Sequence, residues 1–141
     1  LLDVLEHVED DLSTLKTLKS LLTSEGYMII TVPAFPFLWS QHDVEHHHYR
    51  RYVRSSLQER IEKAGLTIKH ITYYNTWLFP IVIVARFLKK MISFNNNGSD
   101  LRVLPSTLNK ILIKIFASER NLVHRYSFPF GVSLLAVVKK G

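Results

Sequence analysis

Tyr27-Met28-Ile29-Ile30-Thr31-Val32 is the stretch of this 141-residue sequence that decides the fold class. The run is short and almost continuously apolar, which is typical of a central β-strand covered on both faces. Upstream, Leu1-Leu2-Asp3-Val4-Leu5 indicates the end of another buried strand. A helix between the two would complete a right-handed βαβ crossover, so the sequence predicts an α/β fold with a parallel portion.

That helix is predicted from leucines that recur at helical spacing over residues 12–22. Asp10 and Asp11 stand in front of the pattern, where acids cap a helix and complement its dipole. Gly26 follows the pattern and is expected to end the helix as a left-handed C-cap.

Predicted helices and strands continue downstream of residue 53. Ser56 and Glu59 have the spacing of a capping box, and Gly65 is expected to close the helix that they begin. The periodicity predicts further elements: a strand at 66–74 near the sheet edge, a polar loop at 93–100, a helix at 106–122, and an apolar strand at 130–138 that enters the sheet antiparallel.

Trp77-Leu78-Phe79-Pro80-Ile81-Val82-Ile83-Val84-Ala85-Arg86-Phe87-Leu88 is the most apolar run of the chain. A membrane span needs roughly 20 apolar residues, and Arg86 interrupts this run. Pro80 fits the first turn of a helix. The sequence leaves open whether this helix covers an active site, packs in the core or lies on a membrane surface. Residues 1–141 are expected to form one domain, with a helical insertion at about 76–128.

Composition narrows the class of protein. A hydrophobic content of 47% is ample for a packed core, and the absence of cysteine excludes disulfides and thiolate metal sites. The net charge of +6 would suit an acidic partner. The first residues are acidic and show no signal peptide, so a cytoplasmic location is expected, with peripheral membrane contact as a variant. Because the chain opens inside a strand without Met, we expect it to be a fragment.

Residues 39–52 form a polar and aromatic segment after the strand at 27–32, with the sequence Trp-Ser-Gln-His-Asp-Val-Glu-His-His-His-Tyr-Arg-Arg-Tyr. Segments that leave the end of a buried strand are common places for the chemistry of an α/β protein. Histidines at 42, 46, 47 and 48 raise the question of a metal. Adjacent histidines are poor chelators on one face, so no metal is expected here.

Several motifs carry a resemblance to a known family. Leu2-Asp3-Val4-Leu5-Glu6-His7-Val8, with Asp10-Asp11 after it, resembles the fourth-strand motif of class I S-adenosylmethionine-dependent methyltransferases. Ser24-Glu25-Gly26-Tyr27 stands at the family's Pro-Gly-Gly turn, and Ala64-Gly65-Leu66 resembles its Ala-Gly-Phe motif. A narrower subgroup is similar in further motifs that span most of the chain: Thr31-Val32-Pro33-Ala34, Leu38-Trp39-Ser40, His42-Asp43, His48, Arg50-Arg51-Tyr52, Asn75, Leu78-Phe79-Pro80 and Pro129-Phe130-Gly131-Val132-Ser133-Leu134-Leu135-Ala136.

The sequence also departs from the family. It has no counterpart of the Gly-rich turn after the first strand, or of the acidic residue that ends the second strand and binds the ribose. At His47 the subgroup more usually has Gly. The resemblance therefore implies the C-terminal part of a Rossmann-like sheet, incomplete, with parallel strands and a C-terminal antiparallel strand. Such a piece is expected to need the missing N-terminal half for activity.

The resemblance implies S-adenosyl-L-methionine as cofactor, beside Leu2 and Asp3, and methyl transfer to an unidentified small-molecule or lipid-linked acceptor. His42 and Asp43 are expected to form a hydrogen-bonded catalytic pair, because a histidine can take the acceptor proton near neutral pH. Further residues are expected on the substrate side, the arginines gripping an anion: His48, Arg50, Arg51 and Tyr52. The alternative is that these side chains only pack and pair within the loop.

A non-catalytic function is the alternative to the enzyme. Lys89-Lys90, Arg50-Arg51 and a lysine-rich helix from Asn109 would make a basic module that binds an anionic membrane surface or a nucleic acid. For the methyltransferase no nucleic acid is expected, and residues 77–90 are the candidate for peripheral membrane contact. An uncovered sheet edge would favour self-association.

Overall fold

A computed structural model describes the backbone of residues 1–92 and 106–141, and the side chains of residues 1–88 and 109–141. The polar loop predicted at 93–100 lies outside the described residues. In chain order the elements are η1 (Leu5–His7), α1 (Asp11–Leu21), β1 (Tyr27–Pro33), η2 (Pro36–Leu38), α2 (Gln41–Glu45), α3 (Arg54–Lys63), β2 (Leu66–Tyr74), α4 (Phe79–Ile92), α5 (Ser106–Ser118), η3 (Glu119–Asn121) and β3 (Ser133–Lys140).

The three described strands form one sheet in the order β1-β3-β2. β3 is antiparallel to both neighbours, with Ala136 opposite Ile30 on one side and Ile71 on the other. This confirms the antiparallel entry of the last strand and the position of β2 at an edge of this sheet. The fold is thus mixed α/β, and among the described residues parallel pairing is limited to isolated bridges, one of them between Leu2 and Thr31.

The N-terminal segment differs from its prediction. A strand was expected over the first five residues, but the segment makes only the Leu2–Thr31 bridge. Asp3 then adopts a positive φ of 49°, and the chain turns into η1. A positive φ is uncommon for a residue with a side chain and ends extended pairing. The predicted βαβ unit is therefore present only as a bridge, a helix and a strand.

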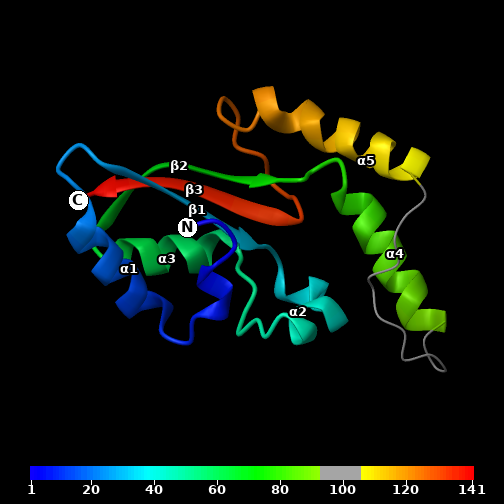
Figure 1. Cartoon of the computed structure of the whole chain (residues 1–141), viewed down its shortest axis with the longest axis horizontal. Helices are drawn as coiled ribbons and strands as arrows, with labels where there is room; N and C mark the ends of the chain where they lie inside the picture. Colours follow the sequence, from blue (N-terminus) through cyan, green and yellow to red (C-terminus); the bar gives the residue numbers. More distant parts are fainter. Residues whose placement is uncertain (93–105) are drawn as a thin grey trace.

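The hydrophobic core lies on one face of the sheet, against α1 and α3 (Figure 1). Leu15 from α1 and Leu57 and Ile61 from α3 are fully buried there. β1 was predicted to be covered on both faces, which is wrong at its start: Tyr27 is 59% exposed and Ile29 49% exposed. Its outward face is left open there because both helices pack on the other side.

The ends of α1 test the capping predictions. Asp10 Oδ1 accepts a hydrogen bond of 2.9 Å from the N–H of Ser13, which confirms the N-terminal cap. α1 ends at Leu21, and the next residue, Leu22, has an extended backbone. Gly26 has no positive φ. Gly26 instead closes a short turn, with its N–H donating to the carbonyl of Thr23 at 3.0 Å, so its predicted role as a left-handed cap is wrong.

α3 differs at its start and agrees at its end. It begins at Arg54, and Ser56 Oγ accepts from the N–H of Val53 at 3.1 Å. Glu59 pairs with Lys63 at 2.6 Å and closes no capping box. Gly65 has a φ of 76°, a conformation that glycine adopts without strain, and it ends the helix as predicted.

α4 and α5 lie at the end of the sheet where β1 ends and β3 begins (Figure 1). α4 has Pro80 in its first turn as expected. An aromatic cluster holds its start: Phe79 packs against Phe35, which stacks on Tyr73 with ring centroids 4.9 Å apart. No helix in the described ranges combines the length and apolar character that a membrane crossing needs.

Candidate functional site

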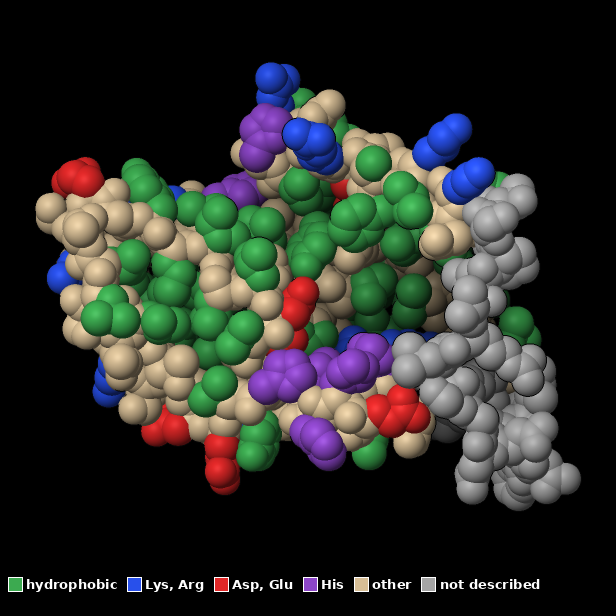
Figure 2. All heavy atoms as spheres, in the orientation of Figure 1, with side chains coloured by type: hydrophobic (Ala, Val, Ile, Leu, Met, Phe, Trp, Pro, Cys, Tyr) green, Lys and Arg blue, Asp and Glu red, His purple; other side chains and the backbone are tan. Residues whose placement is uncertain are grey.

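A cavity of about 380 Å³ opens beside the carboxyl end of β1. Ligands of open α/β sheets collect at this edge. Its walls come from the N-terminal segment, the ends of β1 and β3, the segment around α2, and α4; they are made by Asp3, Glu6, His7, Pro33, His42, His46, His48, Arg51, Arg86, Val132 and Ser133. Figure 2 shows several histidine side chains side by side along this hollowed region.

Asp43 is the polar centre of the segment that borders the cavity. Its side chain is fully buried and accepts hydrogen bonds from Arg51 Nε at 2.7 Å, Arg51 Nη2 at 3.0 Å and the Ser40 N–H at 2.8 Å. Burial alone would raise the pKa of Asp43, but hydrogen bonds from Arg51, His48 and Ser40 outweigh it and lower the pKa to about 2. Asp43 therefore stays ionised at any ordinary pH.

His48 is the histidine that Asp43 orients. Its Nδ1 donates to Asp43 Oδ1 at 2.9 Å, which leaves Nε2 without that partner. His42 was predicted to be hydrogen-bonded to Asp43. Instead its ring packs on His46, with centroids 4.2 Å apart, and burial followed by the charge of His46 lowers its pKa. The pair that forms is thus His48–Asp43, because His42 and Asp43 are neighbours on the short helix α2 and point apart.

The two arginines predicted to grip an anion face opposite sides of the segment. Arg51 lines the cavity, but its guanidinium is bound by Asp43 and by the carbonyl of Ala34 at 3.1 Å. Arg50 turns away, pairing with Asp11 at 3.0 Å and donating to the carbonyl of Glu9. Both are therefore engaged by groups of the chain itself.

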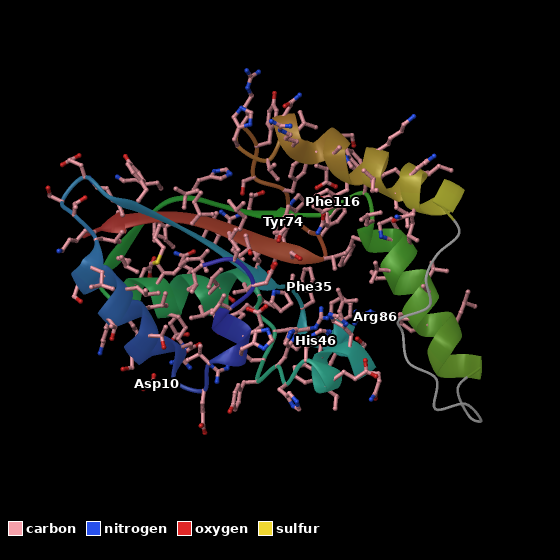
Figure 3. All side chains as sticks on the ribbon, in the orientation of Figure 1. Asp10, Phe35, His46, Tyr74, Arg86 and Phe116 are labelled. Carbon is pink, nitrogen blue, oxygen red and sulfur yellow. The ribbon has the colours of Figure 1, made fainter. Side chains whose placement is uncertain are left out.

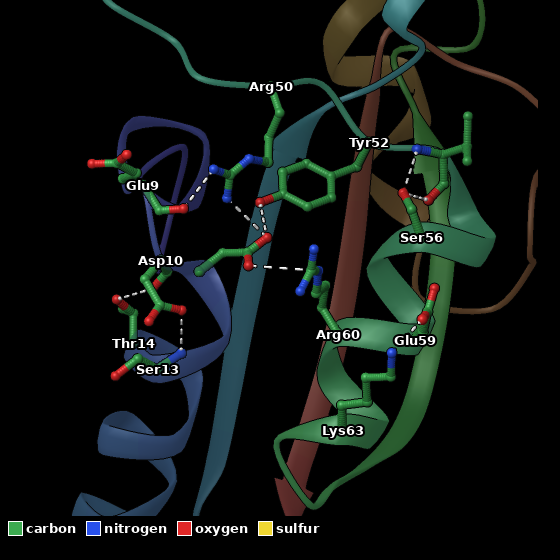
Figure 4. A network of polar contacts seen from close by, with 12 residues as sticks. Glu9, Asp10, Ser13, Thr14, Arg50, Tyr52, Ser56, Glu59, Arg60 and Lys63 are labelled. Atoms are coloured by element: carbon green, nitrogen blue, oxygen red, sulfur yellow. Dashed lines mark hydrogen bonds and ion pairs between the residues drawn. The ribbon is translucent and has the colours of Figure 1, made fainter.

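Tyr52 joins Arg50 on the side away from the cavity (Figure 4). Its hydroxyl donates to Asp11 Oδ2 at 2.9 Å, and Arg60 also approaches Asp11 at 3.6 Å. Burial and the bond to Asp11 raise the pKa of Tyr52. Of the four residues predicted to bind substrate, the structure brings His48 and Arg51 to the cavity and places Arg50 and Tyr52 in this second network.

The residues predicted to contact a cofactor lie at the N-terminal wall. Asp3 lines the cavity and is held by two hydrogen bonds with Thr31. The N–H of Asp3 donates to the Thr31 carbonyl at 3.1 Å, and Thr31 Oγ1 donates to the Asp3 carboxylate at 3.1 Å. Leu2 is exposed in the bridge beside it. Of these two neighbouring residues, Asp3 lines the cavity.

Glu6 and Arg86 are cavity residues for which no definite role was predicted. Glu6 is buried, and burial is the main cause that raises its pKa to about 7. Arg86 reaches from α4 toward His46 (Figure 3), and burial lowers its pKa. Glu6 Oε2 and Arg86 Nη1 have no hydrogen-bond partner among the described residues. The one sequence signal for Arg86 was a single charge inside the most apolar run.

Chemically, the cavity combines proton acceptors with a candidate cation site. His42 and His48 offer imidazole nitrogens, and the half-buried Arg86 offers a buried Nη1 as donor for an anionic group. Within the described residues, Glu6, His7 and His48 each offer one metal-binding atom, all within 4.8 Å of one another.

Comparison with known proteins gives a family and a fold. A model described as "Methyltransferase domain" matches residues 1–71. No curated protein matches the chain. Among solved structures, the chain is similar to Haemonchus contortus phosphoethanolamine N-methyltransferase 2 in complex with S-adenosyl-L-methionine, with a TM-score of 0.50 and 13% identity. The match covers 99% of this chain and 32% of that protein, so the chain spans about a third of its length.

Proposed function

The chain belongs to the methyltransferase domain family, and from this premise we propose that it forms the acceptor-facing part of a class I S-adenosylmethionine-dependent methyltransferase. The observation that carries the proposal is a cavity of about 380 Å³, lined by Asp3 and histidines, at the sheet edge where such proteins bind ligands. On this proposal the antiparallel sheet seen here is one edge of a Rossmann-like sheet, whose parallel part continues beyond the bridge at Leu2.

The residues present fit one side of a cofactor site. Asp3 holds a carboxylate in the cavity wall, and Leu2 is exposed next to it. The sequence has no Gly-rich turn to receive the rest of the cofactor, so we place only its reactive end against this chain. When bound, S-adenosyl-L-methionine supplies a methyl group on a sulfonium sulfur.

His42 is proposed as the proton acceptor. Its lowered pKa keeps the ring neutral at physiological pH, so that it can take the proton of an acceptor O–H or N–H. The sulfonium end of S-adenosyl-L-methionine would lie beside Asp3 and would supply the methyl group to the acceptor atom whose proton His42 takes. Asp43 acts as a positioning residue, because it holds His48 and Arg51 in place beside this reaction.

The anionic group of the acceptor is assigned to Arg86. Arg50 and Arg51 are bound by Asp11 and Asp43, whereas Arg86 presents a buried Nη1 that has no partner among the described residues. A buried, unpaired guanidinium nitrogen is costly unless a ligand satisfies it. The proposed acceptor is therefore a small molecule or lipid-linked compound with a carboxylate or phosphate near its methylated atom.

The test incubates the protein, extended upstream in its gene, with a cell extract and S-adenosylmethionine that carries tritium in its methyl group. The tritium transferred to compounds of the extract is then measured. Partition between the aqueous and organic phases separates a small-molecule acceptor from a lipid-linked one. We expect His42→Gln to lower the rate by roughly 10²–10⁴-fold, whereas His124→Gln, an exposed control, leaves it unchanged. If the extended protein transfers no label to either phase, the enzyme proposal fails.

A second candidate function is contact with an anionic membrane. Apolar side chains recur on α4 and α5 and are about half exposed: Ile81, Val84, Phe87, Leu88, Ile111, Ile113 and Phe116. Lys110 and Lys114 lie on α5 among them. Apolar residues beside lysines on a helix are typical of helices that lie in a membrane interface.

Vesicle flotation tests this second candidate. We expect binding to vesicles with phosphatidylserine, weakened by Phe87→Ser and by added salt, and little binding to neutral vesicles. Flotation that is unchanged by Phe87→Ser and by added salt would contradict membrane contact. A salt-sensitive shift of nucleic acid without flotation would favour a nucleic-acid module instead.

A further inference from the structure

Three side chains at the cavity wall bring metal-binding atoms together from two segments far apart in the sequence. A carboxylate oxygen of Glu6 and one ring nitrogen each of His7 and His48 lie within 4.8 Å of one another. The two imidazole rings meet edge to face, with centroids 4.6 Å apart. η1 supplies Glu6 and His7, and the segment anchored by Asp43 supplies His48.

Glu6 needs a partner that the described residues do not provide. Its side chain is 1% exposed, and Oε2 is buried without a hydrogen bond. An unsatisfied buried carboxylate oxygen carries a desolvation cost that no hydrogen bond offsets. Native proteins rarely tolerate this without a reason, and a bound ion is one of the usual ones. A cation between Glu6 and the two histidines would satisfy that oxygen.

His48 is already arranged as a metal ligand. Its Nδ1 donates to the ionised Asp43, which fixes the ring orientation and leaves Nε2 as the basic nitrogen. Ligating histidines usually donate their other nitrogen to a carboxylate or carbonyl in this way. The Arg51–Asp43 pair holds that carboxylate, so the orientation of His48 does not depend on an ion being present.

The charges around the three side chains favour a cation. Arg51 and Asp43 form a closely matched pair and largely cancel. Of the described residues that line the cavity, Asp3 and Glu6 are then the remaining acids and Arg86 the remaining arginine. With Glu6 ionised, as a ligand must be, the balance of this wall is negative.

We propose that Glu6, His7 and His48 bind one divalent first-row transition-metal ion, with zinc as the representative. Two imidazoles and one carboxylate are the protein ligands of many open metal sites, which keep a further position for water or substrate. Such ligands lie at about 2.0–2.2 Å from zinc, and hence roughly 3.3–3.5 Å from one another. The exposed ring of His7 must therefore move inward on binding. All three ligands line the cavity, and the evidence for the ion does not depend on the proposed methyl transfer.

Calorimetric titration of the full chain with zinc chloride alone tests the proposal. We expect one ion per chain, and loss of affinity by roughly a hundredfold or more in Glu6→Gln and His7→Ala, since even outer partners of ligands contribute 10–100-fold. His46→Ala is the matched control, because His46 lines the same cavity outside the trio and should change affinity little. Magnesium chloride should give no binding, because imidazole does not suit it.

Cobalt absorption provides a second readout that needs no variant in the core. Cobalt(II) in the site should give the intense visible bands of a low-coordinate imidazole and carboxylate environment, and His7→Ala should remove them. His7 is exposed, so this variant is expected to fold. Zinc binding that is unchanged in His7→Ala and Glu6→Gln, or equally weakened in His46→Ala, would overturn the proposal. No S-adenosylmethionine is present, so failure of methyl transfer would leave this result standing.

Discussion

Arg51→Met is expected to be the most destabilising single change in the segment that borders the cavity. The side chain of Arg51 is 4% exposed and that of Asp43 is 0% exposed, and the two groups share bonds of 2.7 and 3.0 Å. Removing the guanidinium leaves the carboxylate buried, with only Ser40 and His48 as partners. The bond to the Ala34 carbonyl is lost as well.

The expected magnitude follows from burial. A hydrogen bond to a charged group contributes about 1.5–3 kcal/mol, and breaking one side of a buried ion pair costs about 3–5 kcal/mol. We therefore expect the free energy of unfolding to fall by about 3–5 kcal/mol. With a urea dependence of about 1.5 kcal/mol per molar, the midpoint should fall by about 2–3 M.

Urea unfolding followed by the fluorescence of the two tryptophans measures this change. Lys63→Met is the matched control, because the Lys63–Glu59 pair is as short at 2.6 Å but has side chains 59% and 61% exposed. We expect the control to leave the urea midpoint nearly unchanged, because exposed ion pairs contribute little to stability. If Arg51→Met does not fold, Arg51→Lys replaces it in the comparison. Because it keeps the charge, we expect it to lose less stability than the roughly 3–5 kcal/mol given for Arg51→Met but more than Lys63→Met.

Burial of the ion pair, and not the distance between its atoms, sets the cost of losing a charge partner. Equal effects of Arg51→Met and Lys63→Met, or a loss below about 1 kcal/mol for Arg51→Met, would refute it. The double variant Asp43→Asn with Arg51→Met should recover part of the loss, since no unpaired charge then stays buried.

Further predictions concern acid, the second network, a close backbone contact and the sheet edge. Because the folded pKa of Asp43 is depressed to about 2, its contribution to stability is complete above pH of about 4 and is lost as the pH falls through about 2; acid unfolding of Asp43→Asn should lack this component. Tyr52→Phe removes the bond to Asp11 and should lower the free energy of unfolding by about 1 kcal/mol in urea, so an unchanged midpoint would contradict the role given to it. Gly131→Ala would place a Cβ in a clash with the carbonyl oxygen of Tyr74 and should cost about 1–3 kcal/mol in thermal unfolding, so a variant as stable as the parent would argue against this packing. The outer edge of β1 is covered by the N-terminal segment only in part, so light scattering should detect dimers or larger species, and a clean monomer would count against self-association.

Local features of the fold were predictable from sequence because they depend on neighbouring residues. The cap of Asp10 on α1 and the closure of α3 by Gly65 follow from side-chain chemistry and from the freedom of glycine. The antiparallel entry of β3 followed from its position after Pro129 and from the resemblance to the family. The open outer face at Tyr27 could not be read from β1, since an apolar run looks alike whether one or both faces are covered.

The segment 39–52 contributes His42, His46, His48 and Arg51 to the cavity wall, but the side-chain pairs within it differ from the expected ones. Asp43 was expected to pair with its neighbour His42, but α2 is followed by a turn in which His47 has a φ of 54°, and this turn brings His48 back to Asp43. Tyr52 and Asp11 are distant in sequence, and no local pattern predicts their contact. Likewise, Glu6 and His48 meet only because η1 and the segment after α2 border the same cavity.

Calorimetric titration with S-adenosylmethionine tests directly whether this cavity serves methyl transfer. The chain alone and the chain extended upstream in its gene should be compared, each with Asp3→Ala and with Asp10→Ala as an exposed acidic control. We expect one site per extended chain, weaker binding in Asp3→Ala, and no change in Asp10→Ala. An extended protein that gives no heat of binding and gains no thermal protection would contradict the claim that this cavity serves methyl transfer.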